Sequence, residues 1–155
     1  MMDRGEYAAQ LFVKGYNCAQ ALAVAFCDLT GYDADTASRM ASSFGGGMGR
    51  MREVCGAVSG MLLVAGLLYG YDQPEDETGK KTHYARVQEL AGQFREQVGS
   101  IICRDILKNP PSDPVPSPRT EAYYASRPCV RMVYLAASVL ERYIAENPIN
   151  AEEKS

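Results

Sequence analysis

Five cysteines are the unusual chemical resource of this 155-residue chain, which has one histidine and no tryptophan. Three of them, Cys55, Cys103 and Cys129, lie where the sequence pattern predicts the first turn of a helix. Unpaired backbone N–H groups and the helix dipole favour a thiolate there, and a thiolate is both a nucleophile and a metal ligand. The three are therefore candidate site residues, although a free cysteine is also often a small buried hydrophobic residue.

The glycine-rich segment GGGMGRMREV directly precedes Cys55. Its glycines expose backbone N–H groups, and Arg50 and Arg52 add positive charge, so a thiolate, a sulfide or an oxyanion would be stabilised beside it. We therefore predict that Cys55 is the most nucleophilic thiol. The segment lacks the phosphate-binding pattern GxxxxGK[ST], which argues against a nucleotide loop. Its candidate cofactor-binding residues are Gly45, Gly46, Gly47, Gly49 and Arg50.

Cys18 lies on the apolar stripe of a predicted first helix, and Cys27 follows it nine residues later. On one straight helix these side chains project about 180° apart, so we expect Cys27 to lie outside any site that contains Cys18. The chain has no CxxC or CxxCH motif, which excludes thioredoxin-like and c-type haem sites by motif. A site of several cysteines must therefore be assembled by the tertiary structure.

Apolar residues recur at helical spacing through most of the chain, and we predict an all-α single domain over residues 1–155. It should be a bundle of about five helices around a buried central helix at about 55–69, which is apolar on every face. In that helix Gly56 and Gly60 should allow a neighbouring helix to approach closely. The other expected helices are 3–29, a second one after the N-cap Asp33, 78–98, a short one at 103–107 begun by Ser100, and one from 129 to 143, before a polar tail from about 147.

The overall charge argues against several classes of partner. The net charge is -3 and the pI is about 5.2, and no long basic run offers a track for a nucleic acid. The apolar stretch at 55–69 is shorter than the roughly 20 residues that a membrane span needs. The N-terminal residues lack an apolar signal segment, so we expect a cytoplasmic protein with no membrane span.

Five motifs carry a family resemblance: Tyr16-Asn-Cys-Ala-Gln20, Phe44-Gly-Gly-Gly-Met-Gly49, Cys55-Gly-Ala-Val-Ser-Gly60, Cys103-Arg-Asp-Ile-Leu107 and Cys129. Together they resemble the bacterial and archaeal C_GCAxxG_C_C family, which is described as redox-active. The resemblance implies that Cys18, Cys55, Cys103 and Cys129 are the characteristic cysteines, and Cys27 departs from the pattern. Because family members are often encoded near transporters or oxidoreductases, it also implies a redox or transporter partner protein.

Two functions compete for these cysteines. In the first, Cys55 forms a reversible disulfide with one of the other three, in a thiol redox carrier or sensor. In the second, Cys18, Cys55, Cys103 and Cys129 hold a metal centre, with an iron-sulfur cluster ahead of zinc because the family context is redox. A third hypothesis is a helical interaction module whose cysteines only pack. The residues leave open whether the protein is an enzyme or a redox protein associated with an oxidoreductase.

Overall fold

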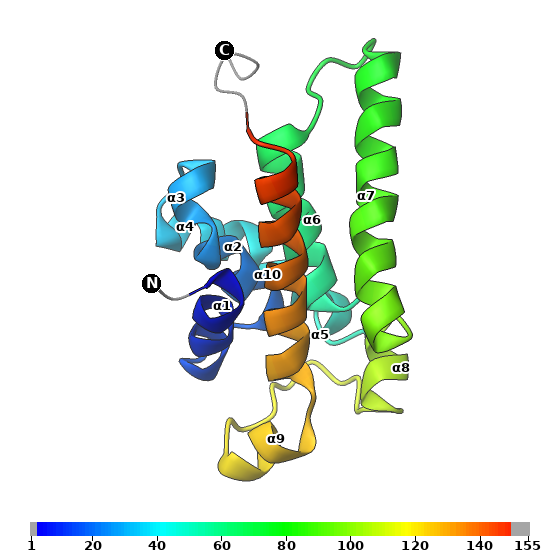
Figure 1. Cartoon of the computed structure of the whole chain (residues 1–155). Helices are drawn as coiled ribbons and strands as arrows, with labels where there is room; N and C mark the ends of the chain where they lie inside the picture. Colours follow the sequence, from blue (N-terminus) through cyan, green and yellow to red (C-terminus); the bar gives the residue numbers. More distant parts are fainter. Residues whose placement is uncertain (1–2, 150–155) are drawn as a thin grey trace.

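The structure is a computed structural model that describes residues 3–149, and within this range the chain is helical and has no strand. This confirms the predicted all-α class. Figure 1 shows the arrangement of the elements. Their bounds are α1 Arg4–Val13, α2 Cys18–Ala25, α3 Cys27–Thr30, α4 Ala34–Ala41, the 3-10 turn η1 Ser42–Phe44, α5 Gly45–Met48, α6 Gly56–Tyr69, α7 Glu77–Val98, α8 Cys103–Leu107, α9 Glu121–Ser126 and α10 Cys129–Glu146.

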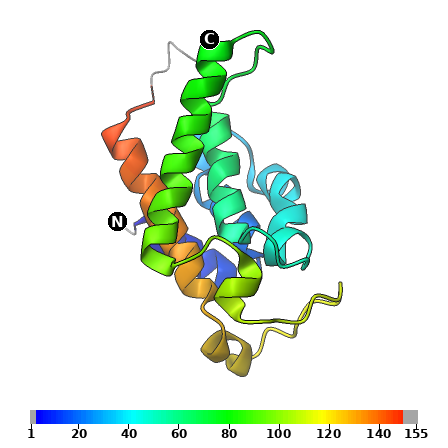
Figure 2. The same ribbon diagram turned by 90° about the vertical axis from the view of Figure 1, so that its right-hand side faces the viewer.

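Helix α6 is the central helix, as its apolar composition predicts. It packs against α2, α7 and α10, and it buries most of its length, including Met61 and Val64. A Cβ atom added to Gly60 would lie 2.7 Å from the carbonyl oxygen of Ala19 and 2.8 Å from Cβ of Leu22. The close approach expected at this glycine is therefore confirmed, and its partner is α2. Figure 2 shows α7, in green, running along the outer side of the bundle.

The predicted first helix, 3–29, is wrong because this segment forms three helices. Gly15 adopts a left-handed backbone with φ 122° after α1. Asn17 then caps α2: its side chain accepts a hydrogen bond from the Gln20 amide, and the Gln20 side chain accepts one from the Asn17 amide. This capping box starts a new helix at Cys18. The apolar spacing continues through the break, which hides it from a periodicity argument.

Other boundaries agree with the predictions more closely. The carboxylate of Asp33 caps α4 by accepting from the Thr36 amide at 2.7 Å, as expected. Helix α7 ends at Val98 as predicted, but Tyr84, expected to face inward, is 52% exposed. Helix α8 begins at Cys103 after Ile102 rather than after Ser100, whose hydroxyl accepts from the Ile102 amide.

The segment before α10 contains helix α9, which the sequence argument did not predict. A proline-rich loop at 109–118 leads into it, and in Figure 1 this region forms the lower end of the molecule. Of the predicted polar tail, residues 150–155 lie outside the described residues. No helix within 3–149 combines the length and the apolar character that crossing a membrane requires.

Candidate functional site

Four cysteines meet at one end of the bundle, where four helices begin. Cys18, Cys103 and Cys129 are the first residues of α2, α8 and α10, and Cys55 is the N-cap of α6. All four line one cavity of about 60 Å³, which we call the cysteine cavity. The structure therefore brings together the four residues that the sequence analysis selected. Three helix starts were predicted, and the fourth, at Cys18, follows from the break before α2.

A short backbone pairing holds Cys55 beside Cys103. Val54 and Ile102 form an isolated antiparallel bridge between the segments that precede α6 and α8. The Cys55 amide donates to the carbonyl of Ile101 at 2.7 Å, and the Cys103 amide donates to the carbonyl of Glu53 at 2.6 Å. Two segments far apart in the sequence thus fix two thiols at one place.

Glycines allow the surrounding segments to close on the sulfurs. Gly46 and Gly47 have φ of 68° and 72°, a left-handed conformation that L residues adopt only at a cost. A Cβ atom on Gly47 would lie 2.7 Å from Cβ of Cys103, and one on Gly56 would collide with Sγ of Cys18. The small residues around Cys55 are therefore required by the packing of the cysteines themselves.

Burial keeps several of these thiols protonated. It raises the pKa of Cys55 above its ordinary value, and negative charge on Cys18 and Cys103 would raise it further, while the Ala57 and Val58 amides oppose the shift. Burial also raises the pKa of Cys18, against the effect of the Gly46 amide. The pKa of Cys129 rises to about 12, again mainly through burial. A reduced cavity at neutral pH therefore holds neutral thiols at these three positions.

Cys103 is the cysteine with a cationic hydrogen-bond donor. The Arg52 guanidinium donates through Nη1 to Sγ of Cys103 at 3.7 Å, and both residues are buried. Arg52 was expected to support Cys55, but the Val54–Ile102 bridge directs it to Cys103 instead. Arg50, the other expected neighbour, donates to the backbone of Asp113 and to the hydroxyl of Ser117. A guanidinium stabilises negative charge on sulfur, and Cys103 rather than Cys55 receives this contact.

Two arginines in the wall of the cavity were missed by the sequence analysis. Arg119 and Arg127 flank α9 and line the cavity with the cysteines. Arg119 donates to the carbonyls of Phe12 and Tyr16. The contact with Phe12 joins residues that are 107 positions apart in the sequence. Such long-range contacts leave no local signal in the sequence.

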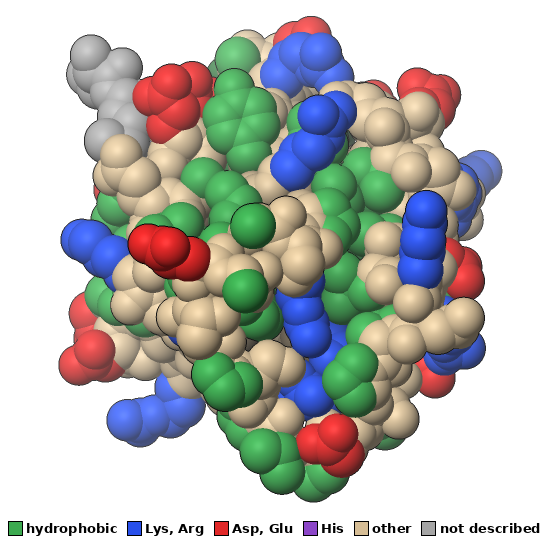
Figure 3. Space-filling view, turned by 90° about the horizontal axis from the view of Figure 1, so that it is seen from below, with side chains coloured by type: hydrophobic (Ala, Val, Ile, Leu, Met, Phe, Trp, Pro, Cys, Tyr) green, Lys and Arg blue, Asp and Glu red, His purple; other side chains and the backbone are tan. Residues whose placement is uncertain are grey.

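The cavity continues into a second, larger one of about 260 Å³, which we call the arginine vestibule. The two cavities share Arg52, Arg119 and Arg127 in their walls. The vestibule also contains Gly45, Gly46, Gly49 and Arg50, so four of the five residues predicted from the glycine loop lie there. Figure 3 views this end of the molecule and shows Lys and Arg side chains sunk into a hollow near the middle of the face.

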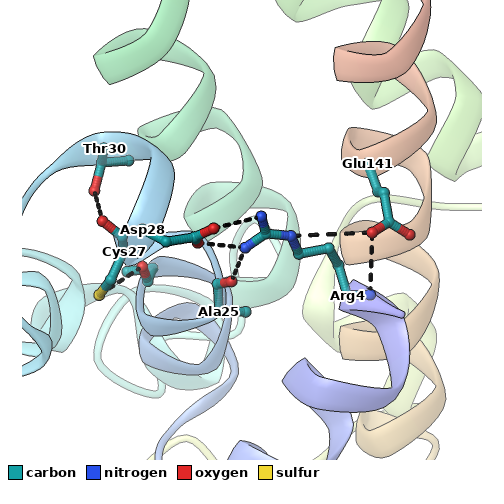
Figure 4. A network of polar contacts seen from close by, with 7 residues as sticks. Arg4, Ala25, Cys27, Asp28, Thr30 and Glu141 are labelled. Carbon is teal, nitrogen blue, oxygen red and sulfur yellow. Dashed lines mark hydrogen bonds and ion pairs between the residues drawn. The ribbon is translucent and has the colours of Figure 1, made fainter. Parts of the chain in front are cut away.

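Cys27 lies apart from the cysteine cavity, at the start of α3. Its sulfur faces the carbonyl of Ala23 at 3.7 Å, beside an ion-pair network centred on Arg4 (Figure 4). The expected separation of Cys27 from Cys18 is observed, but the reason differs. The two residues begin different helices, whereas the prediction placed them on opposite sides of one helix.

The described residues contain neither a disulfide nor a group of side chains arranged as metal-ion ligands. Within residues 3–149, no group of three or more His, Cys, Asp or Glu side chains is arranged to hold a metal ion. All five cysteines are free thiols in the structure.

Comparisons with known proteins give a family but no closer relative. A protein-family model described as "Putative redox-active protein (C_GCAxxG_C_C)" matches residues 16–143 of the chain. The matched region contains the four cysteines of the cavity and the arginines of the vestibule. No curated protein and no solved structure matches the chain.

Proposed function

The chain belongs to the C_GCAxxG_C_C family of redox-active proteins, and we propose that its cysteine cavity carries out reversible dithiol–disulfide exchange. The observation that carries this proposal is the convergence of Cys18, Cys55, Cys103 and Cys129 on one cavity, with Arg52 donating to Cys103. Two thiols in one small cavity can form a disulfide with little movement, and a cation beside one of them favours the attacking thiolate.

Cys103 is the attacking thiol in this proposal, and Cys18 is the resolving thiol. Burial is the main cause that raises the pKa of Cys18, and negative charge on Cys103 raises it further, which supports this pairing. After burial, negative charge on Cys18 or on Cys103 also raises the pKa of Cys55 and of Cys129, so Cys18 and Cys103 are the two thiols that the other two share as neighbours. The Gly46 amide faces its sulfur and stabilises the thiolate that must form during exchange.

The exchange follows ordinary thiol chemistry and needs a disulfide as the second reactant. The Cys103 thiolate attacks one sulfur of a partner disulfide, forms a mixed disulfide and releases the partner's other sulfur as a thiolate. The Cys18 thiolate then attacks Cys103 in the mixed disulfide and releases the second partner thiolate. The chain loses two electrons and two protons in all, and the partner gains them. In the reverse direction the protein oxidises a dithiol.

Disulfide mapping tests this proposal. The reduced protein is oxidised with diamide, digested without reductant and analysed by mass spectrometry, alone and as the Cys18→Ser, Cys103→Ser and Cys27→Ser variants. We expect one intramolecular disulfide, between Cys18 and Cys103, that dithiothreitol reverses and that the Cys27→Ser variant retains. Oxidation that yields no intramolecular disulfide, or one that survives Cys103→Ser, contradicts the assignment.

A further inference from the structure

Arg52 is the one buried charged residue within 3–149, with 4% of its surface exposed. Its Nε donates to the carbonyl of Pro111 at 2.9 Å and its Nη1 donates to Cys103, but its Nη2 has no hydrogen-bond partner among the described residues. Burying a charge without full compensation is costly, so proteins rarely retain one without a ligand or a partner. Arg52 also has a left-handed backbone with φ 61°, a strain typical of functional residues.

The walls of the two cavities that Arg52 lines are rich in arginine. Arg50, Arg119 and Arg127 line the vestibule with it, and no Asp or Glu is part of either cavity wall. Among the described residues, the one carboxylate paired with any of these arginines is that of Asp113, at 3.9 Å from Arg50. Arg119 and Arg127 are held instead by carbonyl or hydroxyl oxygens and by the faces of Tyr123 and Phe12. Their charges therefore remain uncompensated and act on whatever enters the vestibule.

The glycine loop presents its backbone to the same space. Gly46, Gly47, Met48, Gly49 and Arg50 are successive residues with positive φ, so they turn the chain tightly around the vestibule wall. The amides of Gly49 and Arg50 donate to the carbonyl of Gly45 inside the turn. The Gly46 amide already stabilises negative charge at Cys18. At Gly46 the loop thus adds a dipole of the same sign to the charge of the arginines.

We propose that the arginine vestibule binds a compact tetrahedral oxyanion, of the size and charge of sulfate or phosphate, with Nη2 of Arg52 as its innermost donor. The donors come from three separate parts of the chain, around Arg50 and Arg52, around Arg119 and at Arg127, so they approach from several directions. That arrangement matches an oxyanion with oxygens on all sides better than a flat carboxylate. Because Arg52 contacts Cys103, an anion bound to Arg52 lies next to the dithiol.

This inference deepens the proposed function, because it names compact oxyanions as the ligand class admitted to the dithiol site. It also predicts an effect on the thiols. An anion on Arg52 competes with the Cys103 sulfur for the same guanidinium, so occupancy should slow the reaction of Cys103. An anionic reagent that reaches the empty vestibule should instead react faster there than at Cys27.

Calorimetric titration with sulfate, phosphate and acetate tests the binding, with chloride at equal ionic strength as the control for screening. We expect sulfate and phosphate to bind the reduced protein, and acetate to bind at least about tenfold more weakly. Arg52→Met should lower sulfate affinity about tenfold or more, and Arg52→Lys should restore part of it. Arg142→Met removes an exposed arginine near the far end of α10 and should change nothing. Circular dichroism confirms that each variant is folded.

A second readout compares alkylation by iodoacetate and iodoacetamide, measured residue by residue. The ratio of the two rates cancels differences in access, so it reports charge. We expect the ratio at Cys103 to exceed that at Cys27 by about tenfold or more, and to fall when sulfate is added or when Arg52 is changed to Met. Equal ratios at Cys103 and Cys27 together with no sulfate binding would overturn the oxyanion site.

The Cys18→Ser/Cys103→Ser double variant separates this inference from the proposed function. It cannot form the proposed disulfide but keeps every arginine of the vestibule. Sulfate binding by this variant supports the oxyanion site whatever the disulfide mapping shows. If the disulfide forms in the parent while sulfate binds neither protein, the oxyanion site is wrong and the dithiol function stands.

Discussion

Arg4 and Arg52 serve the protein in opposite ways. Arg4 donates to the carbonyl of Ala25 at 2.7 Å and to the carboxylate of Asp28 at 2.8 Å, and lies 3.9 Å from the carboxylate of Glu141 (Figure 4). Arg52 is more deeply buried, touches a thiol and has no carboxylate partner among the described residues. A satisfied arginine ties helices together, whereas an unsatisfied one is available to a ligand.

The five cysteines differ in their surroundings in the same way as the two arginines. Cys27 lies beside the Arg4 network, where the charges are paired and the structure needs no ligand. The other four lie with Arg52, where packing is tight and charge is unpaired. Burial alone therefore does not identify a reactive site in this protein. The identifying feature is burial together with uncompensated charge.

The largest expected effect comes from filling the cysteine end of the bundle. Gly56→Ala places a Cβ atom against Sγ of Cys18 and 2.8 Å from the carbonyl of Phe44. Overpacking of this kind costs about 1–3 kcal/mol or more in unfolding free energy, and the shifted Cys18 should no longer form a disulfide. Urea denaturation and disulfide mapping measure both effects.

Gly92→Ala on α7 is the matched control, because no atom lies within 4 Å of its added Cβ. It should stabilise the protein by roughly 0.5–1 kcal/mol, since alanine is the better helix former. If Gly56→Ala is as well tolerated as Gly92→Ala, the cavity is looser than the structure shows and the close packing of the cysteines is wrong.

Exchanging each arginine for methionine should separate stability from reactivity. Arg4→Met removes side-chain hydrogen bonds and ion pairs that join α1 to α2, α3 and α10, and should cost about 1–2 kcal/mol while leaving Cys103 alkylation unchanged. Arg52→Met should change stability less, because it also removes a buried charge, yet should slow Cys103 alkylation about tenfold. Thermal denaturation and residue-resolved labelling, carried out on both variants, give the comparison. The same profile for both variants would show that the two arginines are equivalent.

Alkaline pH should destabilise the cysteine cavity, and acid pH should destabilise the Arg4 network. At the cysteine cavity, burial raises the pKa of Cys129 from 9.0 to about 12, so the unfolded chain releases this proton first. Stability is therefore present below about pH 9 and falls by about 1.4 kcal/mol per pH unit per such thiol above it. The slope of unfolding free energy against pH should flatten in Cys129→Ala. An unchanged alkaline slope would mean that this thiol does not titrate as the burial requires.

The acid side reports on the Arg4 network. The hydrogen bond from Arg4 lowers the pKa of Asp28 below its ordinary value of 3.8. The stability from this pair is present above that value and is lost as the pH falls through the lowered pKa of the folded state. Arg4→Met should flatten this acid limb and leave the alkaline limb intact, as pH-dependent urea midpoints would show. Loss of both limbs together would argue against two independent regions.

The smallest expected effect is that of Cys27→Ser. This residue is half-buried, and its thiol makes one weak contact with the carbonyl of Ala23. The change should alter unfolding free energy by less than about 0.5 kcal/mol and leave the diamide-induced disulfide intact. Chemical denaturation and thiol titration check this. A lost disulfide would place Cys27 in the redox chemistry, against its position in the structure.

Helical periodicity and helix-start signals predict the class, the central helix and three of the cysteine positions. They miss the start at Cys18, because the capping box of Asn17 and Gln20 lies inside an unbroken apolar pattern. They also assign Arg52 to the nearest cysteine in the sequence, although it contacts Cys103, 51 residues away. That contact depends on an isolated backbone bridge, and the sequence carries no local trace of it.

Residues Arg119 and Arg127 illustrate the same limit. They surround a short helix, α9, that follows a proline-rich loop, and their place in the cavity wall depends on how that loop folds back over α1. Local patterns therefore identify the thiols, while the charges that tune them come from tertiary contacts. The vestibule forms only where the folded chain brings the thiols and these charges together.

A redox titration tests the central claim most directly. The protein is equilibrated in buffers of oxidised and reduced glutathione or dithiothreitol, trapped by acid and alkylation, and the thiols of each cysteine are counted by mass spectrometry. We predict a reversible two-electron transition of Cys18 and Cys103, with a midpoint in the range of about -270 to -120 mV found for exchanging dithiols, while Cys27 stays reduced as a thiol at the same potentials. Cys18 and Cys103 remaining thiols across the whole series, or Cys27 entering the disulfide, would contradict the account.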